Sequence, residues 1–111
     1  MLIYKILRPS ECAAFIAAGA SLGAPVDLSD GFIHFSTASQ VAETAARHFA
    51  GEAGLWLLAC DADSLGPALR WEKSRGGQDF PHLYRPLSVD DVQWMRPLPL
   101  VTTGHDFGVL V

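Results

Sequence analysis

The stretch "LRWEKSRGGQDFPHLYRPL", residues 69–87, predicts two strands joined by a turn. Residues 69–73 are rich in strand formers, and the paired glycines of "SRGGQD" are a turn signal. "FPHLYRPL" is expected to be extended, because each proline disfavours helix for itself and for the residue before it. The turn should therefore fold residues 80–87 back beside residues 69–73.

Periodicity predicts more strands and two helices in the rest of the chain. Strands are expected at residues 2–7, 32–36, 55–61 and about 92–97. One helix should begin at Pro9 and end at Gly19 or Gly23, and the other should begin with a capping box at Thr37 and Gln40 and end at Gly51. Residues 24–31 are expected to be a loop that closes on an Asp-Gly turn.

Helices early and strands late favour the α+β class, a mostly antiparallel sheet with two main helices packed against it. The apolar run 55–61 is expected to be a central strand buried on both faces. The tail, residues 101–111, could dock on the body, add an edge strand, or serve an oligomer contact.

The 111 residues are expected to form one domain, 1–111, and 50% of them are hydrophobic, enough for a compact core. The net charge of -4 argues against a partner such as duplex nucleic acid. No apolar run approaches the ~20 residues of a membrane helix, and the N-terminus lacks a signal-peptide pattern. Cys12 and Cys60 form no CxxC motif, and buried free thiols in a reducing cytoplasm are the simplest explanation for them.

Residues 70–85 carry a local excess of positive charge. Four basic residues stand against two acidic ones there, 4 - 2 = +2: Arg70, Lys73, Arg75 and Arg85 against Glu72 and Asp79. Such a patch on an acidic protein suits a small anionic ligand, and an ordinary solvated hairpin is the alternative.

His34 is a candidate site residue on the strand 32–36. Alternation places Phe32, His34 and Ser36 on one face of that strand, where an imidazole offers both a donor and an acceptor. The N–H groups of the next helix, near Ser36 and Thr37, favour an anion. A hydrogen-bonded core histidine beside an ordinary N-cap is the alternative.

Glu72 and Arg70 share a face of the strand 69–73. They form either a surface ion pair, which contributes little, or a cleft carboxylate that could orient a hydroxyl or stabilise a cationic transition state.

His82 and Tyr84 share a face of residues 80–87, and their rings suit a planar ligand. A rigid edge strand with packed aromatic rings is the alternative, and Pro81 and Pro86 fit an edge.

Common catalytic and metal motifs are absent from the sequence. Its histidines form no HxH, HxxxH or HExxH pattern, so no metal site is expected. Neither a GxSxG elbow, a GxGxxG loop nor a Walker loop occurs.

The segments "DGFIHFSTASQ", "LLACD", "LRWE" and "FPHLYRPL", in this order, resemble a small bacterial family named domain of unknown function 952. The resemblance covers roughly residues 2–97. That family looks like a compact relative of the ADP-ribosyltransferase fold, a split antiparallel sheet that grips NAD in a cleft. The resemblance therefore implies NAD or ADP-ribose as a substrate, with no established cofactor.

By this resemblance, His34 matches the early-strand residue that holds the ribose and the nicotinamide amide. Glu72 matches the later glutamate that grips a ribose hydroxyl and stabilises an oxocarbenium-like transition state. The strand 55–61 has no Tyr or Ser at the middle position, so Tyr84 or Phe80 would have to pack on the nicotinamide.

Three functions follow as hypotheses. The first is a transferase or hydrolase that acts on NAD, ADP-ribose or a related nucleotide through a cleft formed by His34 and Glu72. The second is a nucleotide- or anion-binding module without turnover, and the third is a small interaction protein that dimerises through its tail. The expected ligand-binding residues are Ser36, Thr37, Arg70, His82, Tyr84 and Arg85.

Overall fold

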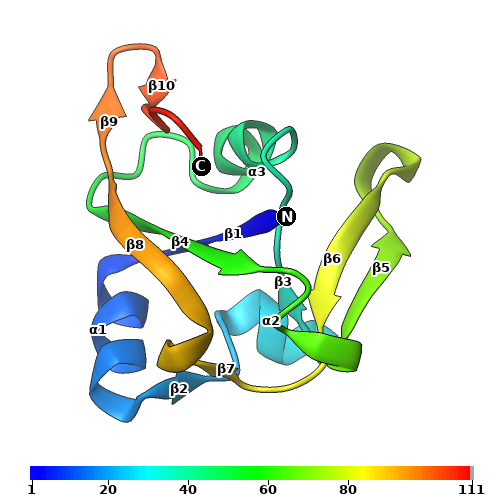
Figure 1. Ribbon diagram of the computed structural model, residues 1–111. Helices are drawn as coiled ribbons and strands as arrows, with labels where there is room; N and C mark the ends of the chain where they lie inside the picture. Colours follow the sequence, from blue (N-terminus) through cyan, green and yellow to red (C-terminus); the bar gives the residue numbers. More distant parts are fainter. Residues whose placement is uncertain (111) are drawn as a thin grey trace.

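The computed structural model describes residues 1–110, and Figure 1 shows the arrangement of its elements. The helices are α1 (Pro9–Ala18), α2 (Pro25–Asp30) and α3 (Val41–His48), with 3₁₀ turns η1 (Gly66–Ala68), η2 (Arg75–Gly77) and η3 (Val89–Asp91). The longer strands are β1 (Leu2–Leu7), β4 (Leu55–Asp61), β5 (Leu69–Lys73), β6 (Asp79–Leu83) and β8 (Val92–Leu98). The two-residue strands are β2 (Ala20–Ser21), β3 (Ile33–His34), β7 (Leu87–Ser88), β9 (Leu100–Val101) and β10 (Gly104–His105).

β4 is the central strand of a three-stranded antiparallel sheet in the order β1-β4-β8. Leu57 and Leu58 point to opposite faces of β4, and both are fully buried. The face of Leu58 packs with α1 through Phe15, and the face of Leu57 packs with α3 through Ala45. The prediction of a central strand covered on both faces is confirmed, and its uniformly apolar sequence follows from this.

A second three-stranded antiparallel sheet has the order β3-β6-β5. Here the predicted hairpin of residues 69–87 is confirmed. The alternative that residues 80–87 form an edge strand is wrong, because β6 is the middle strand of this sheet. Pro81 is tolerated there because pairing with β3 ends at that point: the N–H of Phe35 donates to the carbonyl of Pro81, which has no N–H to return.

The two sheets meet where the chain leaves β3. Ser36 and Tyr4 of β1 exchange both backbone hydrogen bonds, at 2.8 and 2.9 Å. The result is a split antiparallel sheet with helices, which confirms the α+β class, although three α-helices are present where two main ones were expected.

The expectation of a loop at residues 24–31 is wrong, because most of that segment forms α2. Its start has proline at the first helical position, and the N–H of Ala24 donates to the carboxylate of Asp27 at 2.7 Å. Its end is Gly31 in the left-handed conformation, with φ of 85°. These are ordinary helix start and stop signals, compressed into a helix too short to show a hydrophobic period.

The helix predicted to begin at Thr37 begins at Val41 instead and ends at His48. Only half of the expected capping box forms, since Gln40 Oε1 accepts from the N–H of Thr37 while the Thr37 hydroxyl bonds Ser39. The helix α1 ends at Ala18, and Gly19 follows it in the left-handed conformation. Of the two predicted ends, Gly19 and Gly23, the structure therefore confirms Gly19.

The tail docks on the body. β9 and β10 form a hairpin, and Arg96 of β8 donates to the carbonyls of Phe107 and Val109 at 2.6 and 2.9 Å. Leu110 packs against the core on the α3 side, and Val111 lies outside the described residues.

No helix within residues 1–110 is long and apolar enough to span a membrane. Cys12 and Cys60 are buried free thiols, as predicted, and burial raises the pKa of Cys60 to about 12.

Candidate functional site

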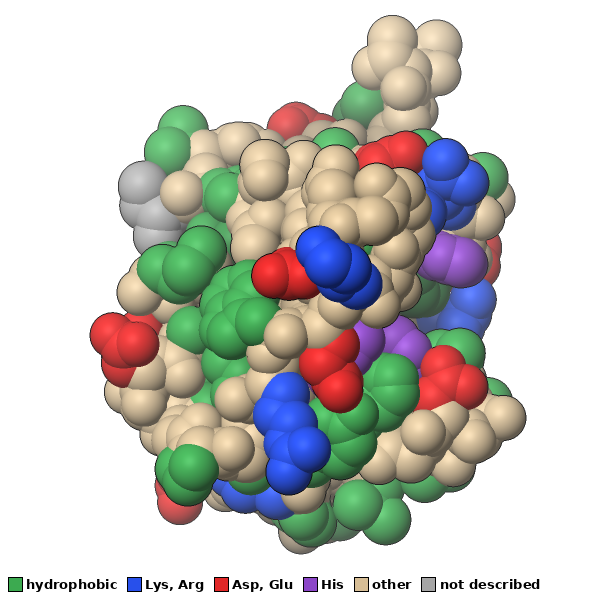
Figure 2. All heavy atoms as spheres, turned by 90° about the vertical axis from the view of Figure 1, so that its right-hand side faces the viewer, with side chains coloured by type: hydrophobic (Ala, Val, Ile, Leu, Met, Phe, Trp, Pro, Cys, Tyr) green, Lys and Arg blue, Asp and Glu red, His purple; other side chains and the backbone are tan. Residues whose placement is uncertain are grey.

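His82 lies at the centre of one face of the β3-β6-β5 sheet. The strand register places it directly opposite His34 of β3 on one side and Arg70 of β5 on the other. Directly opposed residues of antiparallel strands share a face, so these three side chains form one row across the sheet. Glu72 lies two residues from Arg70 and joins the same face. Figure 2 views this side of the molecule and shows histidine side chains between acidic and hydrophobic ones.

Glu72 holds His82 and Tyr84 through a single oxygen. Its Oε1 lies 2.8 Å from Nδ1 of His82 and accepts from the Tyr84 hydroxyl at 2.6 Å. The hydrogen bonds from Tyr84 and then from His82 lower the pKa of Glu72, and the same bond raises the pKa of Tyr84. Glu72 is therefore a carboxylate that accepts from both neighbours, while no described residue donates to its Oε2.

The His82 ring is buried, with 5% of its side chain exposed, yet one of its nitrogens has no protein partner. Nδ1 faces Glu72, and none of the described residues bonds Nε2. No buried side-chain nitrogen or oxygen among them lacks a partner, so Nε2 must reach solvent. Because Nδ1 donates its hydrogen to Glu72, Nε2 of the neutral ring carries a lone pair.

Aromatic rings pack against the two imidazole rings. The Phe32 ring lies 4.2 Å from the His82 ring and 4.6 Å from the His34 ring, measured between centroids, and stacks on Tyr84 at 5.2 Å. The guanidinium of Arg70 lies 5.0 Å from the centre of the Tyr84 ring. The face therefore combines two imidazoles and a carboxylate with apolar surface for a planar group.

His34 is held from below by Asp27 of α2, whose side chain is fully buried. Oδ1 of Asp27 lies 2.6 Å from Nδ1 of His34 and accepts from its backbone N–H at 3.0 Å. Oδ2 accepts from Nζ of Lys5 and from the N–H of Ala24, both at 2.7 Å. The carboxylate thus ties β1, α2 and β3 together under the site.

The partners of Asp27 keep it ionised. Burial alone would raise its pKa, but the hydrogen bond from His34 and the charge of Lys5 outweigh burial and lower the pKa to about 2. Gly23 makes room for this arrangement, since it has φ of 101° and a Cβ there would collide with the Asp27 carboxylate.

The second nitrogen of His34 faces another carboxylate of α2. Nε2 lies 3.0 Å from Oδ2 of Asp30, whose side chain is 45% exposed. The contact with Asp27 is a hydrogen bond, whereas the contact with Asp30 is an ion pair only when the ring is protonated. Asp27 is a fixed partner of His34, whereas the exposed Asp30 can be displaced.

The structure brings five of the predicted site residues together on this face: His34, Arg70, Glu72, His82 and Tyr84. Ser36 and Thr37 have other partners. The Ser36 hydroxyl bonds Thr44 of α3 at 2.9 Å, its N–H donates to Tyr4, and the N–H of Thr37 donates to Gln40. Since α3 begins only at Val41, its first N–H groups do not lie at Ser36 and Thr37, where the sequence placed them.

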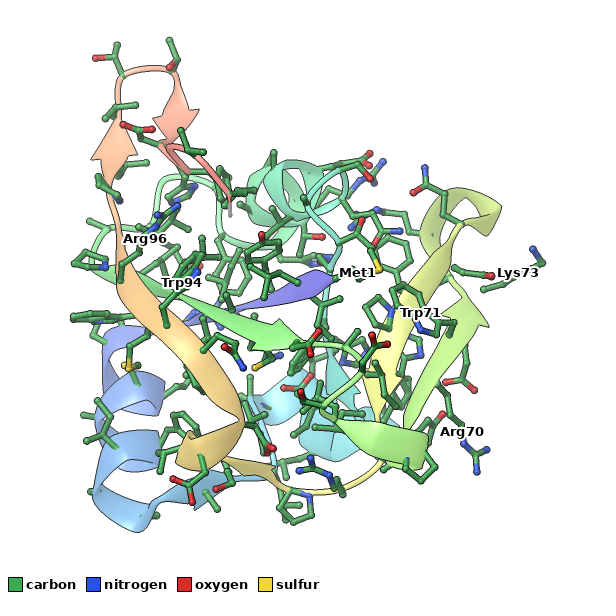
Figure 3. All side chains as sticks on the ribbon, in the orientation of Figure 1. Met1, Arg70, Trp71, Lys73, Trp94 and Arg96 are labelled. Atoms are coloured by element: carbon green, nitrogen blue, oxygen red, sulfur yellow. The ribbon has the colours of Figure 1, made fainter. Side chains whose placement is uncertain are left out.

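Arg85 also points elsewhere. It forms a two-pronged ion pair with Asp91 at 2.8 and 3.0 Å and donates to the carbonyls of Leu65 and Pro86, so it fixes the segment after β6. Lys73 and Arg75 of the expected positive patch pair with other residues, Asp79 and Glu43. Lys73 lies 3.8 Å from Asp79, and Figure 3 shows Arg70 and Lys73 projecting away from the body on β5. The patch is therefore dispersed.

The sequence interpretation missed Lys5, Asp27 and Asp30 as neighbours of His34. A signal for Lys5 was available: it alternates with Ile3 and Leu7, which are buried, so it had to point into the core. The signal for the two aspartates was the helix α2 itself, which places both near β3.

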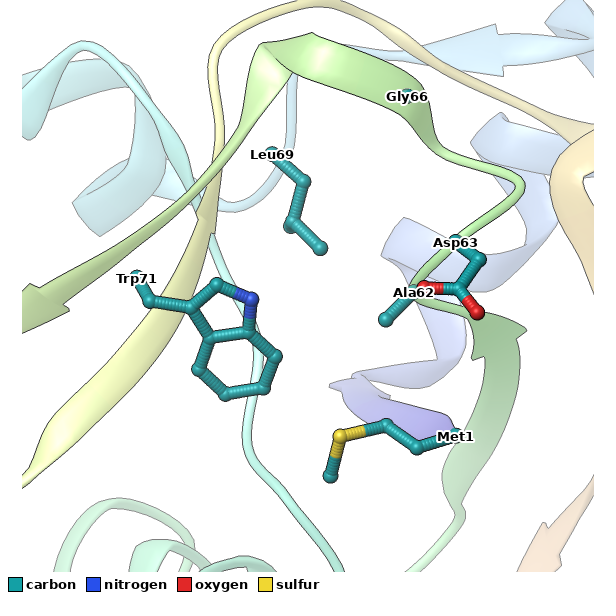
Figure 4. Close-up of a pocket in the computed structure, with 6 residues that line it drawn as sticks. All are labelled: Met1, Ala62, Asp63, Gly66, Leu69 and Trp71. Carbon is teal, nitrogen blue, oxygen red and sulfur yellow. The ribbon is translucent and has the colours of Figure 1, made fainter.

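A second cavity lies away from this chemistry. It has a volume of about 520 Å³ and is lined by Met1, Ala62, Asp63, Gly66, Leu69 and Trp71 (Figure 4). Trp71 points to the side of β5 opposite to Glu72. A smaller cavity of about 290 Å³ adjoins Phe32 and Tyr84, and so borders the histidine face. Within residues 1–110 no cluster of His, Cys, Asp or Glu could hold a metal ion.

Comparison with known proteins places the chain in a family. It is similar to protein CC0527 from Caulobacter crescentus, with 52% identity and a TM-score of 0.91 to the crystal structure, over 95% of this chain and 92% of that one. The solution NMR structure of CC0527 gives 53% identity and a TM-score of 0.84 over 94% and 90% of the two chains. No curated protein matches. The profile of the protein family of unknown function DUF952 matches residues 6–95, and the chain therefore belongs to that family.

Proposed function

We propose that the protein is a transferase or hydrolase that acts on NAD, ADP-ribose or a related nucleotide at the histidine face. The observation that carries this proposal is the pairing of two available groups on one sheet face. Nε2 of the buried His82 and Oε2 of Glu72 have no partner among the described residues. The resemblance to the ADP-ribosyltransferase fold, noted from the sequence, gives the substrate class, and the split antiparallel sheet is compatible with it.

In the proposed reaction, the bond between C1′ of the ribose and the pyridinium nitrogen of NAD breaks. Its electron pair leaves with nicotinamide, which becomes neutral, and positive charge builds on the ribose. Oε2 of Glu72 stabilises that charge, as carboxylates do in glycoside hydrolysis. Water, or the hydroxyl of an acceptor, forms the new bond to C1′ and gives its proton to Nε2 of His82.

His34 has a different proposed role. With Nδ1 donating to Asp27, Nε2 of the protonated ring is an N–H donor that suits a hydroxyl or a phosphate oxygen of the ligand. The rings of Phe32 and Tyr84 provide apolar surface beside the reacting sugar.

The test is ligand binding followed by turnover. ADP-ribose and NAD at millimolar concentration should raise the melting temperature. ADP-ribose and NAD binding should weaken about tenfold in Glu72→Gln, because an amide oxygen accepts from a ribose hydroxyl less strongly than a carboxylate of the same shape does. Release of nicotinamide from NAD, followed by chromatography, distinguishes turnover from binding.

Glu43→Gln is the matched control. Glu43 is an exposed carboxylate of α3 that pairs with Arg47, so its loss should leave both ligand binding and nicotinamide release unchanged. The proposal fails if no nucleotide shifts the melting temperature of the wild-type protein.

A second candidate function is binding of the same ligands without turnover. It is favoured by β4, which has neither a tyrosine nor a serine at the middle-strand position of the transferase pattern.

Asp30→Asn should strengthen the binding of ADP-ribose about threefold, because a ligand oxygen must displace Asp30 from Nε2 of His34 and an exposed pair is worth under ~1 kcal/mol. Titration calorimetry measures the change, with Asp63→Asn, far from this face, as the control. Weaker binding to Asp30→Asn would show that Asp30 contacts the ligand instead of competing with it.

The proposed location is the cytoplasm. Cys12 and Cys60 are free thiols, which suits a reducing compartment.

A further inference from the structure

The cavity of about 290 Å³ beside the histidine face includes lining residues, such as Leu22 and Leu28, that have no role in the proposed chemistry. Its lining includes Leu22, Leu28, Phe32, Tyr84 and Pro86. It lies between α2 and the ends of β3 and β6, and it continues the histidine face through Phe32 and Tyr84, whose rings stack at 5.2 Å.

Two of the residues that line the cavity are solvent-exposed leucines. Leu22 and Leu28 are each 59% exposed, and Tyr84 beside them is 42% exposed. Apolar side chains gathered at a concave surface mark a site for an apolar partner more often than scattered ones do.

The charged residues of the lining are already paired. Arg85 is bound by Asp91 through both terminal nitrogens, and Asp27 is bound by Lys5 and His34. A charged group in this cavity would find no free counter-ion among the described lining residues, so the cavity suits an uncharged group.

The volume limits the size of the occupant. Pockets that enclose whole drug-sized ligands span ~300–1,000 Å³, and about 290 Å³ is at the lower end of that range. It suits one ring system with its substituents rather than a whole dinucleotide.

We propose that this cavity is a subsite for an uncharged heteroaromatic ring, a nucleobase, of the same ligand whose sugar meets His82 and Glu72. The proposal rests on the proposed function, because it assigns a second part of that ligand. Leu22 and Leu28 cover the ring from the α2 side, and Phe32 and Tyr84 separate it from the reacting sugar.

The experiment compares probes with and without a ring. Adenosine and ribose 5-phosphate are titrated into ¹⁵N-labelled protein, and ADP-ribose is titrated by calorimetry. Adenosine should shift the amide signals of Leu28, Gly31 and Phe32, and ribose 5-phosphate should not.

Two variants report on the cavity wall. Leu28→Ser and Leu22→Ser should each weaken ADP-ribose about tenfold, the effect expected for lost apolar contacts in a pocket. Val26→Ser is the matched control, because Val26 is a 56% exposed apolar residue of the same helix that does not line the cavity. Neither leucine is buried, so both variants should fold.

The outcomes separate the two proposals. Weaker ADP-ribose binding in both leucine variants, with Val26→Ser unchanged, supports the ring subsite. Unchanged ADP-ribose binding in all three variants overturns the subsite and leaves the proposed function standing, as does ribose 5-phosphate binding as tightly as ADP-ribose. No binding of any probe to the wild-type protein overturns both.

Discussion

Lys5→Met should lower the free energy of unfolding by about 3 kcal/mol or more. The side chain of Asp27 is fully buried, and that of Lys5 is 8% exposed at 2.7 Å from it. Removing one partner of a buried ion pair typically costs ~3–5 kcal/mol, because the other charge is left without compensation. For a domain of this size, whose total stability is about 5–15 kcal/mol, such a loss is a large fraction.

Urea denaturation, followed by tryptophan fluorescence, measures the effect. Arg47→Met is the control, since the Arg47–Glu43 pair spans the same charge types at 3.2 Å but both side chains are 54% exposed. That variant should lose under ~0.5 kcal/mol. Equal losses in the two variants would show that the Lys5–Asp27 pair contributes no more than a surface pair.

The second large effect is a loss of stability in acid caused by Asp27. Its pKa is about 2 in the folded protein against an ordinary 3.8, so the folded state favours the ionised form. A lowered pKa stabilises the protein above about pH 4, and this contribution disappears as the pH falls from 4 to 2. The difference between the two pKa values corresponds to about 2 kcal/mol.

The comparison of wild type with Asp27→Asn isolates this contribution. Other carboxylates also have lowered pKa values, such as those of Asp61 and Asp91, so both proteins should lose stability in acid. The wild type should lose about 2 kcal/mol more between pH 5 and pH 2, measured by urea denaturation at each pH. Parallel curves for the two proteins would contradict a stabilising ionised Asp27.

The fold could be predicted where a long segment had one periodicity. The strands at residues 2–7, 55–61 and 69–73 and the hairpin at 69–87 were identified from alternation, apolar runs and turn residues, which act locally. The helix α2 could not be identified in the same way. Six residues make less than two turns, so α2 has no hydrophobic period, and its proline and glycine signals also fit a loop.

The order of the strands in the second sheet could not be predicted from local sequence patterns. Pro81 suggested an edge strand, but β6 is the central strand of its sheet. It tolerates Pro81 because β3 is short and its pairing with β6 ends where the proline lacks an N–H. Similarly, the start of α3 moved to Val41 because the N–H of Ser36 bonds Tyr4 across the sheet boundary. Long-range backbone pairing decided both.

For the candidate site, the sequence by itself determined which side chains share a strand face. Arg70 with Glu72, and His82 with Tyr84, follow from the two-residue period of a strand. Only the tertiary structure decided that His34 lies opposite His82, and that Glu72 holds His82 through one oxygen. It also decided that Lys5 and Asp27 meet beneath His34, although they are 22 residues apart. Register between strands and the burial of a charge pair depend on where distant segments pack, and no local periodicity encodes that.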